Sequence, residues 1–371
     1  MKNILICPLN WGRGHATRVR HIAQLLHQDG HNVIVAASAE LLDIFDDSVC
    51  SGRLTFRSIR VRYSSFLPVS LAILIRSPLL LIQFLSDQYR IRGMVKKYKT
   101  DIVISDNRFG AWSGLAYSVY ITHQLTIKVS GRTKLFAGLL SRMHRYIARQ
   151  YDECWIPDIE EGLAGDLTLH PGMDNTRYTG ILSMLKTCEA QRPGGLTGND
   201  YYAVIISGPE PQRSVFETKL IDHFSGDSNN YVIAGGREGG SERGSEGVRE
   251  CWGDGVMECG NIQYYGCLGP GEIKYIISNS RGVICRGGYS TLMDLAVMGR
   301  GALVIPTPGQ TEQEYLAGYL DKKGWIVSYR QSEISAIDIK HMPHPSGFDD
   351  LNNKSEVLLR EAIDGLIRRS S

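Results

Sequence analysis

Residues 2–18 read KNILICPLNWGRGHATR and begin with an apolar run, Lys2–Pro8. A continuous apolar run that ends in a glycine-rich turn predicts a strand buried on both faces. The stretch from about His15 to Gln28 has the spacing of an amphipathic helix, and a second apolar run follows at Asn32–Ala37. This strand–loop–helix–strand order predicts a parallel sheet with a right-handed crossover.

The same alternation continues along the chain and restarts after a loop-rich stretch. Further strands are expected at Asp101–Ser105, Ser118–Thr122, Glu153–Ile156, Tyr202–Ser207, Tyr231–Ala234, Gly282–Cys285 and Ala302–Ile305, and further helices at 87–99, Leu135–Gln150, Thr291–Met298 and Lys354–Arg369. The sequence therefore predicts an α/β fold of two doubly wound, Rossmann-like domains. We expect these domains over residues 1–182 and 201–350, with a linker over 183–200 and a last helix over 351–371. Ligands of such sheets bind beyond the carboxyl ends of the strands, so the expected site is a cleft that both domains face.

The composition is that of a soluble globular protein. The 371 residues are 43% apolar and 22% charged, with a formal net charge of +2. The eight cysteines include no CxxC pair, which favours reduced thiols, although the even spacing of Cys251, Cys259 and Cys267 also fits a metal site. The first residues do not have the pattern of a secretory signal. The pI of about 8.1 and the lack of a stacking motif argue against nucleic-acid binding.

Residues 285–295, CRGGYSTLMDL, join the end of a predicted strand to the start of a helix. Gly287 and Gly288 allow close approach of the backbone to a ligand. The free amide groups at the helix start, around Ser290–Thr291, suit a diphosphate. Asp294, one turn into the helix, can accept hydrogen bonds from ribose hydroxyls. The same residues also fit a structural turn with an acid near the start of its helix.

Polar side chains also follow the next predicted strand, which ends at Pro306 and leads into TPGQTEQEYLA. Gln310, Gln313 and Glu314 lie at the start of the helix that comes next. Amide and carboxylate groups provide the donors and acceptors that sugar hydroxyls require. The two segments together predict a site for a nucleotide-diphosphate sugar.

This pair of segments resembles glycosyltransferase family 28, whose members have the GT-B fold. The family includes the N-acetylglucosaminyltransferase that makes peptidoglycan lipid intermediates, and diacylglycerol glycosyltransferases are related to it. The resemblance implies that Asp294 holds the ribose, that the backbone around Tyr289–Thr291 meets the diphosphate, and that Gln313 and Glu314 hold the sugar. Family members commonly have Gln where this chain has Glu314, which leaves the identity of the sugar open.

The resemblance implies further parts of the donor site. The uracil would lie near Cys267 and Leu268, and the loop Ser207–Arg213 stands where the family has a glycine-rich phosphate loop. In that loop Ser207, Gly208 and Arg213 can reach a phosphate, whereas its prolines fit a structural turn equally well. The resemblance also implies a UDP-sugar donor, no bound metal, and a C-terminal helix that crosses back to the N-terminal domain. The C-terminal domain would bind the donor and the N-terminal domain the acceptor.

The N-terminal turn, NWGRGHATR, points to acid–base chemistry. Gly12 and Gly14 let backbone amides approach a phosphate, and His15 opens the helix. A helix start disfavours the imidazolium, so His15 is expected to be neutral, as a general base must be. The strand Asp101–Ser105 brings Asp106 to the same sheet edge, where related glycosyltransferases use an Asp to orient the His. The alternatives are a capping His and an Asp that caps a turn.

Two stretches of the N-terminal half combine basic and apolar residues without any acid: Ser48–Ser86 and 124–151. Basic residues beside exposed apolar ones predict a surface that contacts anionic lipid. A core helix with a solvated basic face is the alternative. We accordingly expect a cytoplasmic protein, peripheral at the inner face of the membrane. His123 and Gln124 follow a strand in this region and are candidates for the acceptor side.

These observations predict an inverting glycosyltransferase that moves a sugar from a UDP-sugar to a hydroxyl acceptor, lipid-linked or part of a cell-envelope glycan. Two other functions fit the same architecture. One is a UDP-sugar hydrolase, in which the His activates water. The other is a non-catalytic subunit that binds a sugar nucleotide and works with a partner protein.

Overall fold

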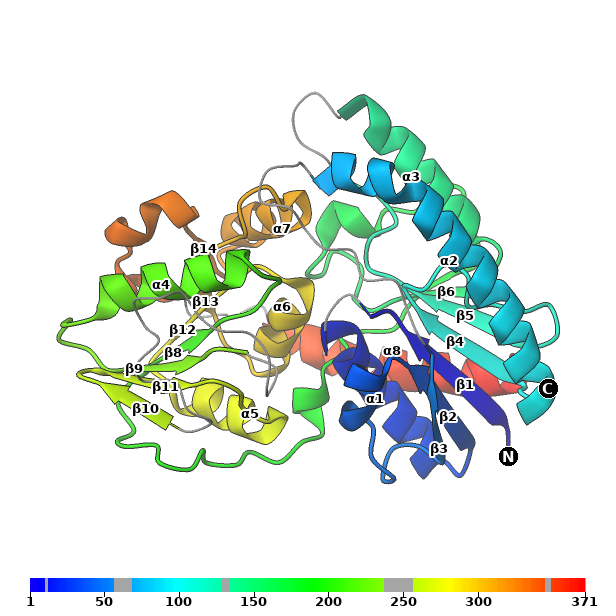
Figure 1. The fold of residues 1–371 in the computed structure, drawn as a ribbon, viewed down its shortest axis with the longest axis horizontal. Coiled ribbons are helices and arrows are strands. Elements are labelled where there is room, and N and C mark those ends of the chain that lie inside the picture. Colours follow the sequence, from blue (N-terminus) through cyan, green and yellow to red (C-terminus); the bar gives the residue numbers. More distant parts are fainter. Residues whose placement is uncertain (11–12, 57–68, 129–133, 237–255, 344–347, 371) are drawn as a thin grey trace. The chain divides into compact units, whose positions relative to one another are not determined.

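The computed structural model describes residues 1–371 except for 11–12, 57–68, 129–133, 237–255, 344–347 and 371. The chain forms two compact units. The first consists of Met1–Met184 together with Asp350–Ser371, and the second consists of Leu185–Asp349. Each unit holds one sheet with helices on both of its faces (Figure 1).

In the first unit, seven strands pair in parallel in the order β3-β2-β1-β4-β5-β6-β7. These strands are β1 (Asn3–Pro8), β2 (Asn32–Ala37), β3 (Gly52–Thr55), β4 (Ile102–Asp106), β5 (Tyr117–Ile121), β6 (Glu153–Ile156) and β7 (Thr176–Tyr178). The α-helices of this unit are α1 (Arg13–Gln28), α2 (Val69–Tyr98), α3 (Lys134–Ala148) and α8 (Phe348–Arg369). Short 3₁₀ helices occur at Ala39–Ile44, Gly165–Thr168 and Met184–Lys186.

The sheet of the first unit is buried on both faces, which explains its continuous apolar strands. In β1, Ile4 and Ile6 pack in a cluster with residues of α1 and α8. The alternate residues, Leu5 and Cys7, pack in a second cluster with residues of α2. Successive side chains of a strand point to opposite faces, so both sets are buried.

The C-terminal helix α8 packs on the first unit, as the sequence predicts. Leu359, Ile363 and Leu366 are at most 4% exposed and belong to the same cluster as Ile4 and Ile6. At the end of the helix, the Arg369 side chain donates a hydrogen bond to the Glu153 carboxylate of β6. Residues from the two ends of the chain therefore complete one core.

Helix α2 is longer than its predicted range of 87–99. It begins at Val69 and runs through Pro78. A proline inside a helix removes one backbone hydrogen bond, so the sequence pattern does not predict a helix that runs through this position. Its last two turns contribute Ile91 and Val95 to the core.

The second unit holds a seven-stranded sheet in the order β10-β11-β9-β8-β12-β13-β14. The strands are β8 (Tyr202–Ile205), β9 (Tyr231–Ala234), β10 (Val256–Cys259), β11 (Ile262–Tyr265), β12 (Val283–Cys285), β13 (Ala302–Val304) and β14 (Val327–Ser328). The helices are α4 (Gln212–Phe224), α5 (Pro270–Asn279), α6 (Tyr289–Val297) and α7 (Thr311–Lys322). All pairs are parallel except β10 with β11, so loops that are far apart in sequence follow the carboxyl ends of β8, β12 and β13 together.

The segment 183–200, which the sequence marks as a linker, contacts the second unit along α5 and β11. Gln191 donates its backbone N–H to the Gly271 carbonyl, and Thr197 donates to the Gln263 side chain. Leu196 is 7% exposed and packs in the apolar cluster around Ile276. Most of this segment is therefore part of the second unit.

Candidate functional site

The predicted pair of His15 and Asp106 forms in the first unit. Strands β1 and β4 are neighbours, and Pro8 pairs with Asp106, so the turn after β1 lies beside the end of β4. The His15 Nδ1 atom is 3.1 Å from Asp106 Oδ2. The Asp106 side chain is fully buried, whereas that of His15 is 18% exposed. A buried carboxylate thus contacts the Nδ1 atom of a partly accessible imidazole.

Arg18 joins this pair and was not predicted from the sequence. Its Nε donates to Asp106 Oδ2 over 2.8 Å, and its Nη2 donates to Asp106 Oδ1. The same Nη2 lies 2.9 Å from His15 Nδ1. Arg18 is only 2% exposed, so the two-point contact with Asp106 is a buried ion pair. His15 and Arg18 are three residues apart on α1, the spacing that places two side chains on one helix face.

Burial and the neighbouring charges shift the pKa of His15 in opposite directions. Burial lowers the pKa of the imidazole, Asp106 raises it, and Arg18 lowers it again, with a net lowering. For Asp106, burial by itself would raise the pKa, but Arg18 and His15 outweigh burial and hold the pKa below its ordinary value. The cluster therefore favours a neutral His15 beside an ionised Asp106.

His123 belongs to the same cluster, whereas Gln124 is placed at its margin. The His123 Nδ1 atom is 3.5 Å from Arg18 Nη1, and the residue is 7% exposed. Gln124 is partly buried and donates its backbone N–H to Thr122. Gly14 is a partly buried residue in the first turn of α1. Gly12, which was predicted with Gly14 to approach a phosphate, lies outside the described residues.

In the second unit, the two segments that carry the family resemblance touch. A Cβ placed on Gly287 would lie 3.4 Å from the backbone oxygen of Gln313. Gln313 accepts a hydrogen bond from the Thr307 backbone and donates one to Gln310. The loops after β12 and β13 are therefore packed against each other, and Gln310 and Gln313 hold each other in place.

Helix α6 begins directly after Gly288, and its first residues differ in exposure. Tyr289 is 4% exposed, whereas Ser290, Thr291 and Asp294 are partly exposed. Partly exposed polar groups at a helix start leave backbone amides accessible to an anion.

Glu314 is exposed and lies in the first turn of α7. Its carboxylate accepts the backbone N–H of Gly309 over 3.0 Å, in the loop that precedes the helix. This bond has the form of a helix cap, and it fixes one carboxylate oxygen. The second oxygen of the group stays available for a hydroxyl donor.

The loop after β8 is held by an ion pair. Arg213 Nε donates to Glu210 over 2.8 Å, and its Nη1 donates to the Gly236 carbonyl. Ser207 is partly buried, and Gly208 is exposed with φ of 110°, a backbone conformation that favours glycine. Glu210 neutralises part of the charge that Arg213 would offer to a phosphate.

The two residues expected near a nucleobase follow β11. Cys267 is exposed, and Leu268 is partly buried against an apolar cluster that includes Leu196 and Tyr265. This cluster gives an apolar environment beside the loop.

Arg286 is a second buried cation that was not predicted. It is fully buried, its guanidinium lies 3.7 Å from the centroid of the Phe216 ring, and its Nη2 donates to Gln331 over 2.7 Å. Its Nη1 donates to the backbone carbonyls of Ile305 and Pro306. Burial lowers its pKa to about 10. Arg286 thereby connects the loops after β12 and β13 with the start of α4.

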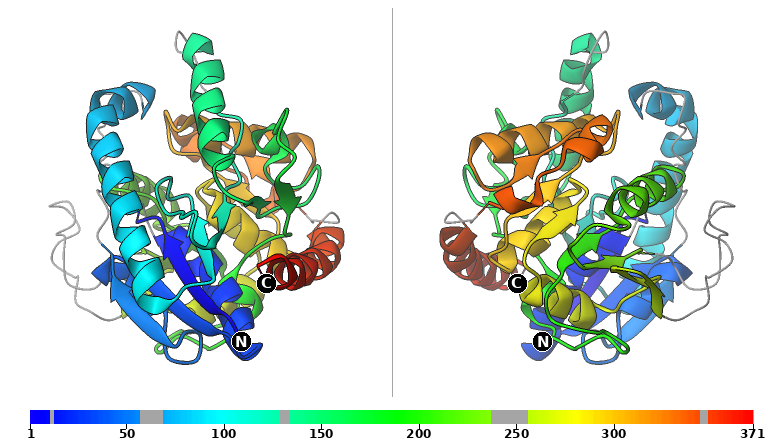
Figure 2. Two further views of the ribbon diagram at one scale, coloured as in Figure 1. Left: turned by 90° about the vertical axis from the view of Figure 1, so that its right-hand side faces the viewer. Right: turned by 90° about the vertical axis from the view of Figure 1, so that its left-hand side faces the viewer.

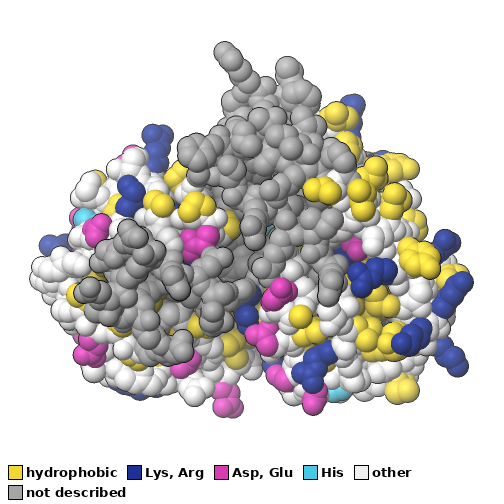
Figure 3. Space-filling view, viewed as in Figure 1, with side chains coloured by type: hydrophobic (Ala, Val, Ile, Leu, Met, Phe, Trp, Pro, Cys, Tyr) yellow, Lys and Arg dark blue, Asp and Glu magenta, His cyan; other side chains and the backbone are white. Residues whose placement is uncertain are grey.

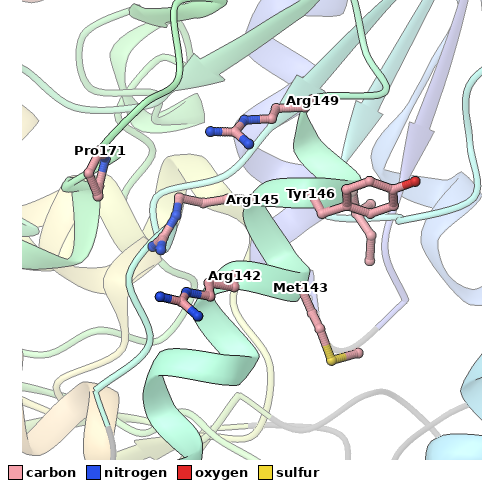
Figure 4. A pocket seen from close by; sticks show the side chains of 7 residues that line it. Arg142, Met143, Arg145, Tyr146, Arg149 and Pro171 are labelled. Atoms are coloured by element: carbon pink, nitrogen blue, oxygen red, sulfur yellow. The ribbon is translucent and has the colours of Figure 1, made fainter.

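A basic pocket lies on α3 of the first unit. Arg142, Arg145 and Arg149 line a cavity of ≈ 600 Å³ and point to the same side of the helix, toward Pro171 (Figure 4). Burial and the two neighbouring arginines lower the pKa of Arg145. The three side chains on one side of the helix concentrate positive charge there.

Exposed apolar residues accompany this pocket on α3 and α2. On α3, Leu139, Met143 and Tyr146 are 55% to 66% exposed. On α2, the exposed apolar residues at helical spacing are Leu79, Leu81, Ile82, Leu85 and Tyr89. Figure 3 shows apolar and basic side chains interspersed over the region of α2, and Figure 2 shows both helices extending beyond the sheet of their unit. None of the helices, over the part of the chain that is described, has the length and apolarity needed to cross a membrane.

The fold and the donor-side segment define the class of protein as a GT-B glycosyltransferase. Residues 271–342 match the model of the glycosyltransferase family 28 C-terminal domain. This confirms the predicted resemblance in the segment where the sequence places it, and it supports a glycosyltransferase enzyme. A sequence search of curated proteins finds no match.

Solved structures confirm the fold over the whole chain. The glycosyltransferase of kitacinnamycin is 13% identical, with a TM-score of 0.66, and the match covers 100% of this chain and 99% of the other. SnogD from Streptomyces nogalater is 13% identical, with a TM-score of 0.63 and complete coverage of both chains. The spinosyn rhamnosyltransferase SpnG, complexed with thymidine diphosphate, is 13% identical, with a TM-score of 0.58 over 97% of this chain and 96% of the other.

Proposed function

We propose that this protein is an inverting glycosyltransferase that moves a sugar from a UDP-sugar to a hydroxyl acceptor. The observation that carries the proposal is the hydrogen-bonding contact of 3.1 Å between His15 Nδ1 and the buried Asp106. A buried carboxylate that accepts from Nδ1–H leaves the lone pair on Nε2, where a general base needs it. The match of residues 271–342 to a glycosyltransferase domain supports the sugar-nucleotide donor.

In the proposed reaction His15 removes the proton from the acceptor hydroxyl. The acceptor oxygen then forms a bond to the anomeric carbon as the bond from that carbon to the UDP oxygen breaks. The configuration inverts, UDP leaves with the electron pair, and the proton stays on His15 Nε2 until solvent takes it. Asp106 stabilises the imidazolium that forms, because its carboxylate accepts from Nδ1–H. Base catalysis of this kind contributes about 10²–10⁴-fold.

The second unit would hold the donor. We assign the diphosphate to the backbone of Gly287–Thr291 at the start of α6, and the ribose to Asp294. Helix starts stabilise a leaving diphosphate without a metal ion, and we propose that none is required. The remaining donor contacts in this unit are proposed at Ser207, Gly208, Arg213, Cys267, Leu268, Gln310, Gln313 and Glu314.

A thymidine diphosphate sugar is the second candidate donor. It is favoured by two structures with this fold that were solved with thymidine diphosphate, SpnG and VinC. The two nucleotides differ at the 2′-hydroxyl of the sugar ring, which is present only in UDP, and at C5 of the base, which carries a methyl group only in thymidine diphosphate. Competition of UDP and thymidine diphosphate for the protein therefore separates the two donors.

The acceptor is proposed to be lipid-linked or part of a cell-envelope glycan, used at the inner face of the membrane. The surface of α3 and α2 supports this proposal, because three arginines lie beside exposed apolar side chains. Such a surface gains free energy both from anionic headgroups and from burial of apolar area. The cytoplasmic location follows from the acceptor and is part of the same proposal.

The decisive experiment compares turnover with donor binding in His15→Ala. We expect transfer from UDP-sugars to fall by at least about a hundredfold while UDP still raises the thermal stability of the variant. Unchanged transfer would refute the base. Release of free sugar by the wild-type protein without an acceptor would favour the hydrolase, and absence of turnover with any donor would favour the binding subunit.

Flotation with vesicles tests the membrane surface separately. We expect binding to phosphatidylglycerol vesicles at low salt and little binding to phosphatidylcholine vesicles. The triple variant Arg142→Glu, Arg145→Glu, Arg149→Glu should lose this binding. Equal binding of the triple variant and the wild type would exclude the pocket on α3 as the contact.

A further inference from the structure

Arg18 lies at the centre of the cluster around His15 and takes no part in the proposed proton transfer. It is 2% exposed and contacts three of the side chains considered above: both oxygens of Asp106, Nδ1 of His15 and Nδ1 of His123. This buried guanidinium does more than neutralise one carboxylate. It competes with Asp106 for a hydrogen bond with His15 Nδ1.

The competition concerns one atom, His15 Nδ1. If Nδ1 carries a proton, it donates to Asp106 Oδ2, and Nε2 keeps the lone pair. If Nδ1 has no proton, it accepts from Arg18 Nη2, and the proton is on Nε2. Only the first tautomer can act as a base through Nε2, so Asp106 and Arg18 favour opposite states of the same ring.

Protonation of His15 changes this balance. The imidazolium donates from Nδ1 and can no longer accept from Arg18, and two positive charges then lie side by side. Arg18 therefore opposes the charged state, whereas Asp106 supports it. The groups that face His15 are Arg18 on its own helix, Asp106 at the end of β4 and His123 after β5. Of these, only Asp106 is negative.

We propose that Arg18 is a positioning residue that fixes the Asp106 carboxylate at two points and sets the pH at which His15 becomes a neutral base. The inference rests on the proposed role of His15 in catalysis. Without Arg18, the imidazolium of His15 would be the remaining cation in contact with the fully buried Asp106 among the described residues, so His15 would hold its proton to a higher pH. With Arg18, the carboxylate is already neutralised and the base is free at lower pH.

The test measures the protonation of His15 directly, by NMR titration of protein labelled at histidine Cε1, with His15→Gln to assign the signal. In Arg18→Met we expect the pKa of His15 to rise by about one unit, a tenfold change in its protonation ratio. In Asp106→Asn it should fall below the wild-type value. The matched control is Arg20→Met, since Arg20 is also on α1 and pairs with an aspartate, Asp46, away from His15. This control should leave the His15 titration unchanged.

Arg18→Met leaves a buried carboxylate without its partner and can fail to fold. The double variant Arg18→Met, Asp106→Asn avoids this, because it removes both buried charges. Its His15 pKa should lie above that of Asp106→Asn alone. An equal value in these two variants, or an unchanged value in folded Arg18→Met, would overturn the proposal.

Activity gives the second measurement. The acid limb of the kcat/KM profile should move to higher pH in Arg18→Met, by the same amount as the NMR titration, whereas a purely structural loss would lower the whole profile without moving the limb. Arg18→Lys keeps the charge but not the two-point contact, so we expect a lower kcat and a limb near the wild-type position. The NMR result does not require turnover. A failure of the proposed enzyme function is thus distinguishable from a failure of the role of Arg18.

Discussion

Gly287 lies against Gln313: a Cβ on the glycine would be 3.4 Å from the backbone oxygen of Gln313 and 3.3 Å from a methyl carbon of Val304. The glycine comes from the loop after β12, and the glutamine from the first turn of α7. The two segments that are proposed to hold the diphosphate and the sugar are therefore packed in direct contact, and a side chain at position 287 would crowd Val304.

The variant Gly287→Val tests this packing. The added methyl groups must displace Val304 or the first turn of α7, which costs about 1–3 kcal/mol in the free energy of unfolding. We also expect the KM for the donor to rise, because Gln313 moves with that turn. Chemical denaturation and donor titration check both effects. Gly194→Val, at a glycine with no neighbouring atom within 4 Å, is the control and should change neither.

Asp294→Asn tests the nucleotide. If the carboxylate accepts from both ribose hydroxyls, the variant should weaken UDP binding by about 1.5–3 kcal/mol and thymidine diphosphate binding by less, because the latter lacks the 2′-hydroxyl. Calorimetric titration of the two nucleotides measures the difference. An equal loss for both would contradict contact with the 2′-hydroxyl, and no loss for either would remove Asp294 from the site.

Glu153 makes the stability of the first unit depend on pH. Burial by itself would raise its pKa, but hydrogen bonds from Arg369, Trp155 and Tyr117 outweigh burial, and the pKa lies below the ordinary value of 4.5. A carboxyl with a lowered pKa in the folded state stabilises the fold above its ordinary pKa, and this contribution is lost as the pH falls through the lowered value.

The variant Glu153→Gln should therefore be less stable than the wild type at pH 7, by about 1.5–3 kcal/mol. The difference should narrow as the pH falls below 4.5. Urea denaturation of both proteins at pH values from about 3 to about 7 checks this difference in stability. A difference that stays constant over the whole range would show that the charge of Glu153 is not the cause.

Leu366→Ala tests the role of α8. Leu366 is fully buried in the core of the first unit, so the variant should lose about 2–5 kcal/mol of stability. Val357→Ala, at a residue of the same helix that is 58% exposed, is the matched control and should lose roughly 0.5 kcal/mol or less. Thermal unfolding measures both. Similar losses would mean that α8 does not complete this core.

The sequence predicts the pair His15 and Asp106 from sheet geometry together with the resemblance to related glycosyltransferases. Both residues follow the carboxyl ends of apolar runs, and the ends of parallel strands lie on one sheet edge. The donor-side loops were found for the same reason, with Gly287 and Gln313 each following a strand.

Arg18 and Arg286 were missed because a basic residue near a helix start is ordinarily solvated, and their burial depends on tertiary contacts. For Arg18 one signal was available, its spacing of three residues from His15 on one helix. For Arg286 none was, since its ring partner, Phe216, is seventy residues away in the chain. The full length of α2 was also missed, because Pro78 has the pattern of a helix boundary.

The placement of α8 has a consequence for how the molecule is made. Residues 185–349 are an insertion within the first unit, and the helix that fills the remaining side of its core is translated after them. During synthesis the core of the first unit is therefore incomplete until the whole second unit has left the ribosome. Until then Ile4 and Ile6 lack the contacts that α8 contributes. Of the two units, only the second is continuous in sequence and can complete its core before the end of the chain is made.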